Sequence, residues 1–509
     1  MSKEILKAAK AFVTKYKTYP SMSELMMLGL KRTTIRDNYG NLQGLHDALY
    51  SECKDVIFDL NREDKQTLDT KKYKRYIITT AITGDEVFSK ALKSLRKYEK
   101  EQKAKLIIHV GKGNKNLGQT LDPILRGSFI CLEDMWLNDN AKLVSLFQSG
   151  SKTDPTSGGI PRIGKRDSSI ILGSPKQRLV YTATGIDKLA HAIMSTGAIT
   201  LPKYDKTKAS GYVADYDHVM GAIVVEIEND EIFHFRQVQF DKDGGFVDLG
   251  RYYCGNKTGK MAPAVMVLGD WHSGKTCPLV KKASYAITKK LGIKEWVLHD
   301  VYDSHSANHH EIGKLLLLSK KAEIEELDLD KELNGLAKDF KEMAKAGLKI
   351  TVVKSNHDEF LDRYLDSGAW MKHPYNTKIC LELAQAMTRG QSPLEYAMSV
   401  NETSRSVDIN WLQRDESYLI GGIECGAHGD KGPNGTRGSL QAIERAYDKV
   451  VIGHQHTPGI LREAWCVGTS TLPYPDYGTG PSSWMNTHCL IYPNGHRQLI
   501  NCINGKFHL

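Results

Sequence analysis

Five short clusters of histidine, aspartate and asparagine residues stand out in the second half of this 509-residue sequence. Thirteen of the 18 histidines lie between His272 and the C-terminus. Each cluster follows an apolar run, and these runs are AVMVL, WVL, KITVV, GGIEC and KVVI. In chain order the clusters contain Asp270 and His272, then Asp300, then Asn356 and His357, then His428, and finally His454 and His456.

Carboxylate, amide and imidazole groups bind divalent metal ions in hydrolytic sites, and the absence of cysteine from the set disfavours a structural zinc site. In Asp-x-His and His-x-His pairs on extended chain, both side chains point to the same side. We expect two ions, Mn²⁺ first, with Mg²⁺, Fe or Zn²⁺ as alternatives. One ion would take Asp270, His272 and His456, the other would take Asn356, His428 and His454, and Asp300 would bridge them.

Two ions about 3.5–4 Å apart can lower the pKa of a shared water and bind a phosphoryl oxygen during in-line attack. The expected chemistry is therefore attack of a metal-bound hydroxide on phosphorus. His357 is not needed as a ligand and could donate a proton to the leaving oxygen. We predict His357 and Asp300 as the catalytic residues. A single histidine cluster is often structural, but five in this order are hard to explain by packing.

A competing motif overlaps the first cluster, because GDWHSGKT (269–276) satisfies the G-x-x-x-x-G-K-[ST] pattern of a phosphate-binding loop. Such a loop surrounds phosphate with backbone N–H groups, and the carboxylate of Asp270 would face the same anion. Pro278 would also fall early in the helix that should follow. The nucleotide interpretation leaves the other four clusters unexplained, so we expect no nucleotide cofactor.

Two polar loops near the clusters could contact substrate phosphates. One contains His305, and the other, DKGPNGTRG (430–438), contains Lys431 and Arg437. For His305, a solvated polar loop is the alternative.

The apolar runs predict strands that place these clusters just beyond their C-terminal ends, where open α/β sheets build ligand sites. The segments between them, such as 311–347, are rich in helix formers and predict crossover helices. We therefore expect an α/β catalytic domain over 263–509.

The middle of the chain, 63–262, predicts a mixed α/β accessory domain without a catalytic cluster. Strands at 75–82 and 105–110 flank a helical segment at 85–102, which together predict a β-α-β unit. Further short strands are expected at 168–173, 178–183, 197–202, 221–228, 232–240 and 244–250.

The first 62 residues predict a helical domain with a helix-turn-helix pattern. After a lysine-rich amphipathic helix, a short helix ends at Gly29, and a second opens with polar and basic residues. The alternative is a small helical bundle used only for packing or assembly. The predicted DNA contacts are Lys31, Arg32, Thr33, Thr34 and Arg36.

The distribution of charge favours nucleic-acid binding at this end. Residues 1–105 hold 22 Lys and Arg against 14 Asp and Glu, whereas the remaining 404 residues hold 47 against 46. The net charge of +9 therefore lies almost entirely in the first fifth of the chain. Basic residues bind phosphates with release of counterions.

Composition excludes several protein classes. Hydrophobic residues make up 40% and charged residues 25%, as in average globular proteins, and no apolar run approaches the length of a membrane span. The lysine-dotted N-terminus predicts no signal peptide. Nine scattered cysteines without a C-x-x-C pair fit a reducing cytoplasm. We expect a cytoplasmic homo-oligomer that does not bind membranes.

The motifs GDWH, the HD of VLHD, SNHD, the AHG of GAHGD, and GHQH resemble the five ordered motifs of calcineurin-like metallophosphoesterases. The resemblance covers roughly 263–509 and implies a four-layer α/β/β/α sandwich with a binuclear metal centre. His299 and Ser355 stand where that family usually has glycine, which puts the local turns in doubt.

By presumed substrate, the nearest branch is the SbcD-type DNA nucleases. The overall layout also resembles phage-encoded pre-early proteins that degrade host DNA, which would act in the infected bacterial cell. The sequence thus predicts a Mn²⁺-dependent DNA nuclease. The alternatives are a metallophosphatase or phosphodiesterase with a substrate other than DNA, and a DNA-binding assembly protein with a vestigial nuclease centre.

Overall fold

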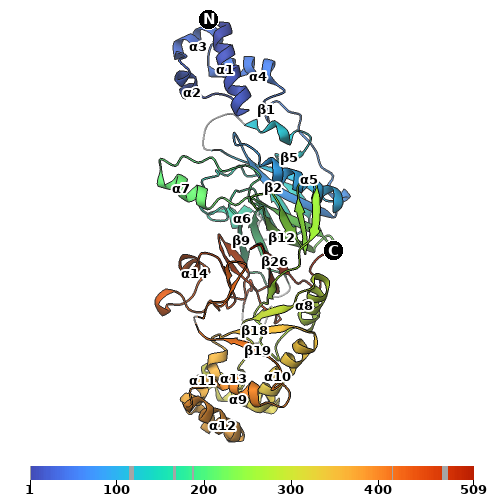
Figure 1. The fold of residues 1–509 in the computed structure, drawn as a ribbon, viewed down its shortest axis with the longest axis vertical. Coiled ribbons are helices and arrows are strands. Elements are labelled where there is room, and N and C mark those ends of the chain that lie inside the picture. The colour runs from blue at the N-terminus through green and yellow to red at the C-terminus, as the bar shows by residue number, and fades with distance from the viewer. Residues whose placement is uncertain (1, 114–119, 164–167, 186–187, 415, 473–479) are drawn as a thin grey trace. The chain divides into compact units, whose positions relative to one another are not determined.

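The computed structural model describes residues 2–113, 120–163, 168–185, 188–414, 416–472 and 480–509 (Figure 1). The chain divides into two compact units. The first contains residues 1–179 and 192–260, together with 509, and the second contains 180–191 and 261–508. No helix in the described ranges is both long enough and apolar enough to cross a membrane. The predicted division into three domains remains a prediction.

Four helices form the N-terminal part of the first unit, and their sequence explains their ends. Ser21 and Glu24 form a reciprocal capping box at the start of the second helix. Gly29, at φ 82°, makes the turn into the third helix, where the left-handed region favours glycine. Ile5, Leu25, Ile35 and Leu45 pack in one buried cluster. The helices are α1 (Ser2–Tyr16), α2 (Met22–Met27), α3 (Arg32–Tyr39) and α4 (Leu42–Cys53).

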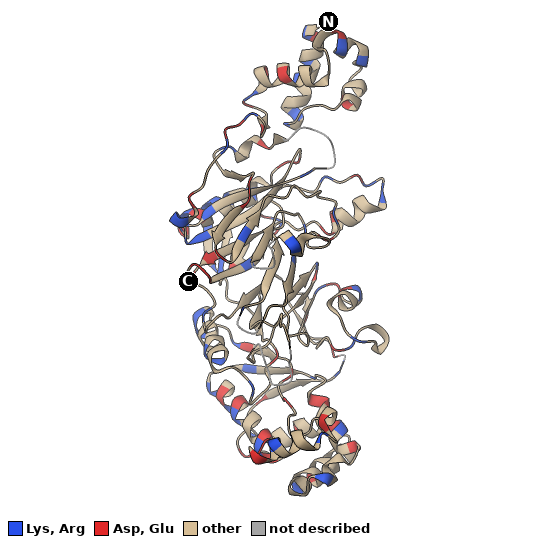
Figure 2. Ribbon diagram, turned by 180° about the vertical axis from the view of Figure 1, so that it is seen from behind, with Lys and Arg blue, Asp and Glu red and all other residues tan. Residues whose placement is uncertain are grey.

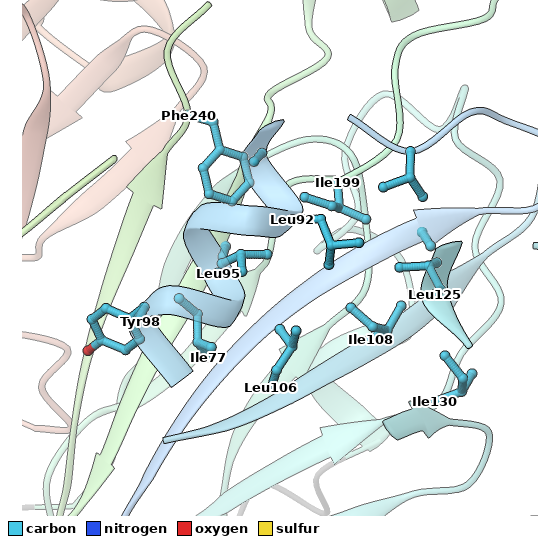
Figure 3. Close-up of a cluster of buried hydrophobic side chains, with 14 of the residues drawn as sticks. Ile77, Leu92, Leu95, Tyr98, Leu106, Ile108, Leu125, Ile130, Ile199 and Phe240 are labelled. Atoms are coloured by element: carbon cyan, nitrogen blue, oxygen red, sulfur yellow. The ribbon is translucent and has the colours of Figure 1, made fainter. Parts of the chain in front are cut away.

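The predicted β-α-β unit is confirmed, because β2 (Arg75–Ile82) and β3 (Lys105–Gly111) are parallel neighbours joined through α5 (Ser89–Glu101). The helix begins at Ser89, four residues after the predicted start. Leu92, Leu95 and Tyr98 of α5 pack over Ile77 and Ile108 of the two strands (Figure 3). The sheet runs in the order β12-β11-β2-β3-β5 and includes β5 (Phe129–Cys131), β11 (Gly221–Ile227) and β12 (Phe233–Gln239).

The other predicted strands of this region are present, with one exception. Residues 197–202 make only isolated bridges, and His191–Ser195 (β10) pairs in parallel with β8 instead. The reason is local, because Gly197 takes φ 82° and breaks the extended run after β10. The remaining elements are β1 (Phe58–Asp59), β4 (Thr120–Leu121), β6 (Met135–Asn138), β7 (Ala141–Val144), α6 (Ile160–Ile163), β8 (Ser169–Leu172), β9 (Arg178–Thr182), α7 (Ala209–Tyr216), β13 (Phe246–Asp248), β14 (Arg251–Cys254) and β15 (Lys257–Lys260).

The second unit contains a mixed six-stranded sheet in the order β19-β18-β17-β16-β25-β26. The first four of these strands are parallel, and β25 runs antiparallel to β16. Because parallel strands need crossovers, helices stand between them in the chain. The strands are β16 (Val265–Val267), β17 (Glu295–Leu298), β18 (Lys349–Val353), β19 (Ile409–Leu412), β25 (Thr487–Ile491) and β26 (Arg497–Asn501).

Further strands of this unit run in the order β20-β21-β22-β24-β23. They are β20 (Leu419–Ile420), β21 (Ile423–Glu424), β22 (Val450–Ile452), β23 (Gly459–Leu461) and β24 (Ala464–Cys466). The helices are α8 (Pro278–Leu291), α9 (Leu315–Glu323), α10 (Leu329–Lys345), α11 (Asp358–Asp366), α12 (Thr377–Thr388), α13 (Pro393–Val400) and α14 (Leu440–Ala446). The protein is therefore mixed α/β, as expected, whereas the four-layer sandwich remains a prediction.

Candidate metal centre

Three neighbouring parallel strands bring the first clusters to one edge of the six-stranded sheet. Asp270 follows β16, Asp300 follows β17 and Asn356 follows β18. Because β16, β17 and β18 are parallel and adjacent, their C-terminal ends lie together. Sheet topology therefore gathers side chains that are far apart in the chain.

The other clusters follow two strands of the second sheet. His428 comes after β21, and His454 and His456 come after β22. These two strands are also parallel neighbours, so their clusters emerge at the same edge. All the predicted metal ligands lie in the second unit.

Four of the predicted ligands form one buried group. Asp270, His272, Asp300 and His456 each offer a ligand atom within 4.8 Å of the others. The Nε2 atoms of His272 and His456 lie 3.2 Å apart. His456 Nε2 is also 3.1 Å from Asp270 Oδ2, and His272 Nε2 is 3.7 Å from Asp300 Oδ2. These four residues are the first predicted ligand set and the predicted bridge, and their binding of a metal remains a prediction.

The second predicted ligand set lies on the other side of Asp300. His428 Nε2 is 3.0 Å from Asn356 Oδ1 and 3.4 Å from Asp300 Oδ1. The ring of His454 packs edge-on against His428, with 5.2 Å between ring centroids. Asp300 thus touches both histidine groups, through Oδ2 on one side and Oδ1 on the other.

The donor set fits divalent cations. The four carboxylate oxygens of Asp270 and Asp300 are buried, and none has a hydrogen-bond partner within the described part of the chain. Unpaired buried carboxylates are costly unless a cation neutralises them. His272 Nδ1 faces the carboxylate of Asp303 at 3.0 Å, so Nδ1 carries a proton and Nε2, directed toward His456, is the ring atom available to a metal. Oxygen and imidazole lone pairs therefore converge, as metal binding requires.

The pKa values at the centre show the same electrostatic pattern. Burial holds the pKa of His428 down to about 4, which keeps its ring neutral and able to bind a metal. Burial also opposes charge on His272, but the hydrogen bond to Asp303 and the negative charge of Asp300 raise its pKa to about 9. Burial would raise the pKa of Asp300, yet His428, His357 and His272 hold it well below its usual range. The carboxylates therefore create a local potential that favours positive charge.

Four of the predicted ligands have backbone conformations that side chains rarely adopt. His272, Asp300, His454 and His456 take φ values of 47°, 43°, 71° and 56°. Non-glycine residues in this left-handed region cost about 1–2 kcal/mol each. Such strain commonly gathers at functional sites, because the surrounding fold holds side chains in directions that relaxed backbone would not give.

A close backbone approach explains Gly453, which precedes His454. A Cβ atom there would lie 2.3 Å from Asp270 Oδ1 and 2.9 Å from the Cβ of His299. Only glycine lets the loop after β22 come this near to the loop after β16. The two sheet edges can therefore share one centre.

Several residues that support the centre were not among the predicted site residues. Asp303 accepts a hydrogen bond from His272 Nδ1, and its other oxygen lies 3.4 Å from His305 Nδ1. His305 Nδ1 is in turn 2.9 Å from the buried Glu332. The D-x-x-D spacing of Asp300 and Asp303 was the available signal, whereas nothing in the sequence connects Glu332 to the site.

A second supporting carboxylate lies under the loop after β18. Asp358 Oδ2 accepts hydrogen bonds from the backbone N–H and the hydroxyl of Ser355. Burial and the charge of Asp300 raise the pKa of Asp358 to about 7. Ser355, which stands where the resembled family has glycine, therefore stabilises this turn with its own side chain.

His299, the other departure from the family pattern, is fully buried next to the centre. Its Nδ1 lies 3.4 Å from His428 Nδ1. Burial lowers the pKa of His299, so its ring packs as a neutral group against the ligand histidine.

The predicted general acid, His357, lies against the ligands. Its Nδ1 donates to the backbone carbonyl of Asp303 at 2.8 Å, which leaves Nε2 for other partners. Its ring is 4.7 Å from that of His272 and stacks on Phe360 at the same distance between centroids. Its catalytic role remains a prediction.

The predicted phosphate and DNA contacts lie in different places. His305 lies beside the centre, as described. Lys431 and Arg437 are exposed, and their backbones form an isolated β-bridge with each other. Lys275, the lysine of the competing nucleotide motif, pairs with Glu326 at 2.8 Å. In the first unit, four of the five predicted DNA contacts are exposed on α3 or just before it, and Thr34 is half-buried; the exposed ones are Lys31, Arg32, Thr33 and Arg36. These DNA and phosphate roles remain predictions.

Comparison with known proteins gives one relative. The chain is 30% identical over 481 residues to Protein A1 of Escherichia phage T5, and the alignment covers 86% of this chain and 84% of that protein. No protein-family model matches the chain. No solved structure matches it either. The similarity therefore extends over most of both chains and is not confined to the motifs.

Proposed function

The chain belongs to the family of Protein A1 of Escherichia phage T5, and from that premise we propose that it is a phage-encoded, metal-dependent nuclease that hydrolyses DNA phosphodiester bonds. One observation carries the proposal. Asp270 and Asp300 place buried carboxylate oxygens without hydrogen-bond partners in the described structure beside two histidines whose Nε2 atoms converge. Such a site, at the C-terminal ends of parallel strands, favours hydrolysis supported by divalent cations.

Asp270, His272 and His456 would hold one ion, and Asn356, His428 and His454 would hold the second. Asp300 would contact both ions, because its two oxygens face the two histidine groups. Divalent ions held there would supply positive charge for a phosphoryl oxygen and would lower the pKa of a water molecule. Manganese is the first candidate because the donors are oxygen and imidazole without thiolate.

The protein's own groups would orient these ligands and move the proton. Asp303 fixes the tautomer and direction of His272, as carboxylates commonly do for metal-binding histidines. His357 is oriented by the carbonyl of Asp303, so its Nε2 is the atom that would donate to the leaving oxygen.

The N-terminal helices would bind the DNA, which we propose is host DNA degraded during infection. Lys and Arg recur along α1–α4 (blue in Figure 2), and α3 exposes Arg32 in its first turn and Arg36 in its last turn. Exposed basic side chains on a short helix suit contact with DNA phosphates. We propose a homo-oligomeric nuclease with this helical region as its DNA-binding part.

Plasmid digestion tests the proposal. Wild-type protein and His428→Ala are incubated with supercoiled, linear and single-stranded DNA in Mn²⁺, Mg²⁺ or EDTA. We expect cleavage by the wild type with Mn²⁺, none in EDTA, and a loss of about a hundredfold or more in His428→Ala. If no DNA form is cleaved with any metal, the nuclease proposal is wrong.

A further inference from the structure

A cavity of about 960 Å³ opens beside the candidate metal centre, within the second unit. Asn356 and His357 from the loop after β18 form one wall, and α9 forms another through Leu317 and Lys320. Phe360 of α11 also lines it. The cavity lies at the upper end of the range of about 300–1,000 Å³ typical of small-molecule sites. The cavity therefore extends from His357, the predicted general acid, to α9, a helix that has no predicted catalytic role.

The charges in this cavity favour an anion. Its acidic groups are already paired: Glu311 with Lys321 at 2.6 Å, Glu326 with Lys275 at 2.8 Å, and Asp303 with His272. Lys314 and Lys320 also line the cavity, and neither has an ion-pair partner among the residues that the structure describes. Two cationic side chains are thus available near the centre.

The rest of the wall is apolar and aromatic. Phe360 stacks against His357, and the exposed ring of His310 lies edge-on to Phe360, with 5.5 Å between centroids. Leu317 and Ile324 of the α9 segment are 36% and 62% exposed, and both line the cavity. No residue of α9 is buried, so the packing of this helix does not account for these apolar side chains.

We propose that this cavity binds an unpaired nucleotide of a DNA strand, with its phosphate near Lys314 and Lys320 and its base against Leu317, Ile324 and Phe360. The inference rests on the proposed nuclease function and specifies its substrate. A base inside a duplex is stacked and paired, so only a base outside the stack could reach this wall. Contact between a base and apolar or aromatic side chains, combined with a cationic surface for the backbone, is typical of single-strand binding.

The structure also explains why α9 would stay in place as a wall. Lys321 in its last turn pairs with Glu311 and donates to the backbone carbonyl of His305 at 3.0 Å. His305 Nδ1 lies 2.9 Å from Glu332 and 3.4 Å from Asp303, the carboxylate that supports His272. The helix is therefore connected through two side chains to the carboxylate that supports His272.

The test uses the full-length protein with Mn²⁺ and three substrates: a single-stranded oligonucleotide, a blunt duplex of the same sequence, and the small diester bis(p-nitrophenyl) phosphate. We expect kcat/KM for the single strand to exceed that for the blunt duplex about tenfold, since stacking of one base contributes about 5- to 150-fold in binding. In Lys314→Ala/Lys320→Ala, and separately in Leu317→Asp, the ratio of kcat/KM for the single strand to that for the small diester should fall about tenfold. Lys338→Ala/Lys341→Ala, which removes two exposed charges from α10, is the matched control. It should leave kcat/KM unchanged for both the single strand and the small diester.

Equal cleavage of single strand and duplex, or an unchanged ratio in both cavity variants, would overturn the inference and leave the nuclease function standing. Hydrolysis of the small diester without cleavage of any DNA would overturn both. A fall in the ratio for the cavity variants but not for the control supports the nucleotide pocket.

Discussion

The Nε2 atoms of His272 and His456 lie 3.2 Å apart, although 184 positions separate the two residues in the chain. Each ring follows a strand of a different sheet, and each residue has a positive φ. Two imidazole nitrogens at this distance cannot both carry a proton toward each other without repulsion. Their approach, with the buried carboxylate oxygens of Asp270 and Asp300 beside them, is what a shared cation would stabilise.

Asp303→Ala should lower the affinity for Mn²⁺ by about ten- to a hundredfold, because His272 loses the carboxylate that orients its ring. Calorimetric titration of the metal-free protein measures this. The exposed Asp366, changed to Asn, is the control for loss of a carboxylate on a nearby helix. Unchanged affinity in Asp303→Ala would show that His272 does not depend on Asp303.

Gly453→Ala should abolish high-affinity metal binding and cut DNA cleavage by about a hundredfold or more, since misplacing a reacting group by about 1 Å has effects of that size. The new Cβ would lie 2.3 Å from Asp270 Oδ1 and would displace the carboxylate. Gly335→Ala in α10 is the matched control, because a Cβ there meets nothing within 4 Å. The control should keep full activity and gain about 1 kcal/mol in unfolding free energy.

Backbone strain at His454 predicts an unusual order of stability. The backbone of His454 has φ 71°, in the left-handed region that alanine disfavours and glycine adopts freely. The variant His454→Gly should therefore be more stable than His454→Ala by about 1–2 kcal/mol. Urea unfolding in EDTA measures the difference. At Lys338, inside α10, the alanine variant should instead be more stable than the glycine variant by about 1 kcal/mol. The same order at both positions would argue against strain at His454.

His305 should make the stability of the second unit depend on pH. Burial opposes its charge, but the hydrogen bonds to Asp303 and Glu332 raise its pKa to about 9, above the unfolded value of 6.5. The stabilisation is therefore fully present below pH 6.5 and is lost as pH rises through 9. A shift of this size corresponds to at most about 3 kcal/mol. Urea unfolding of the metal-free protein at pH 6 and pH 9.5 should show the full loss in wild type and in the exposed-residue control His310→Gln. The loss should be smaller in His305→Gln, where only His272, whose pKa is also raised to about 9, still contributes.

The double variant Arg32→Ala/Arg36→Ala should weaken DNA affinity and reduce the slope of log affinity against log salt by about 2, because each arginine that no longer neutralises a phosphate lowers the slope by about one unit. Fluorescence anisotropy at several salt concentrations, with EDTA present to prevent cleavage, measures both quantities. Lys338→Ala/Lys341→Ala removes the same charge elsewhere and should leave the slope unchanged. An unchanged slope in the α3 variant would contradict DNA binding by this helix.

Local patterns were enough to predict many elements. The alternation and length of the apolar runs predicted β2, β3 and the strands before each cluster, and the glycine turn predicted the break between α2 and α3. The prediction failed at 197–202, where an apolar run resembles a strand but Gly197 takes a positive φ and the pairing strand is β10. Pairing depends on partners distant in the chain, which a local pattern does not contain.

By itself, the sequence determined which side chains could bind metal and their order along the chain, because residue type and distance from the end of a strand are local properties. Only the tertiary structure decided which of them meet. The order of strands in each sheet placed His272 beside His456 and Asp300 between the two histidine groups. Helix and loop packing also brought Asp303, His305 and Glu332 into contact behind the centre, and placed Lys314 and Lys320 along a cavity beside it. Those distances follow from non-local strand pairing and helix packing, which no short stretch of sequence specifies.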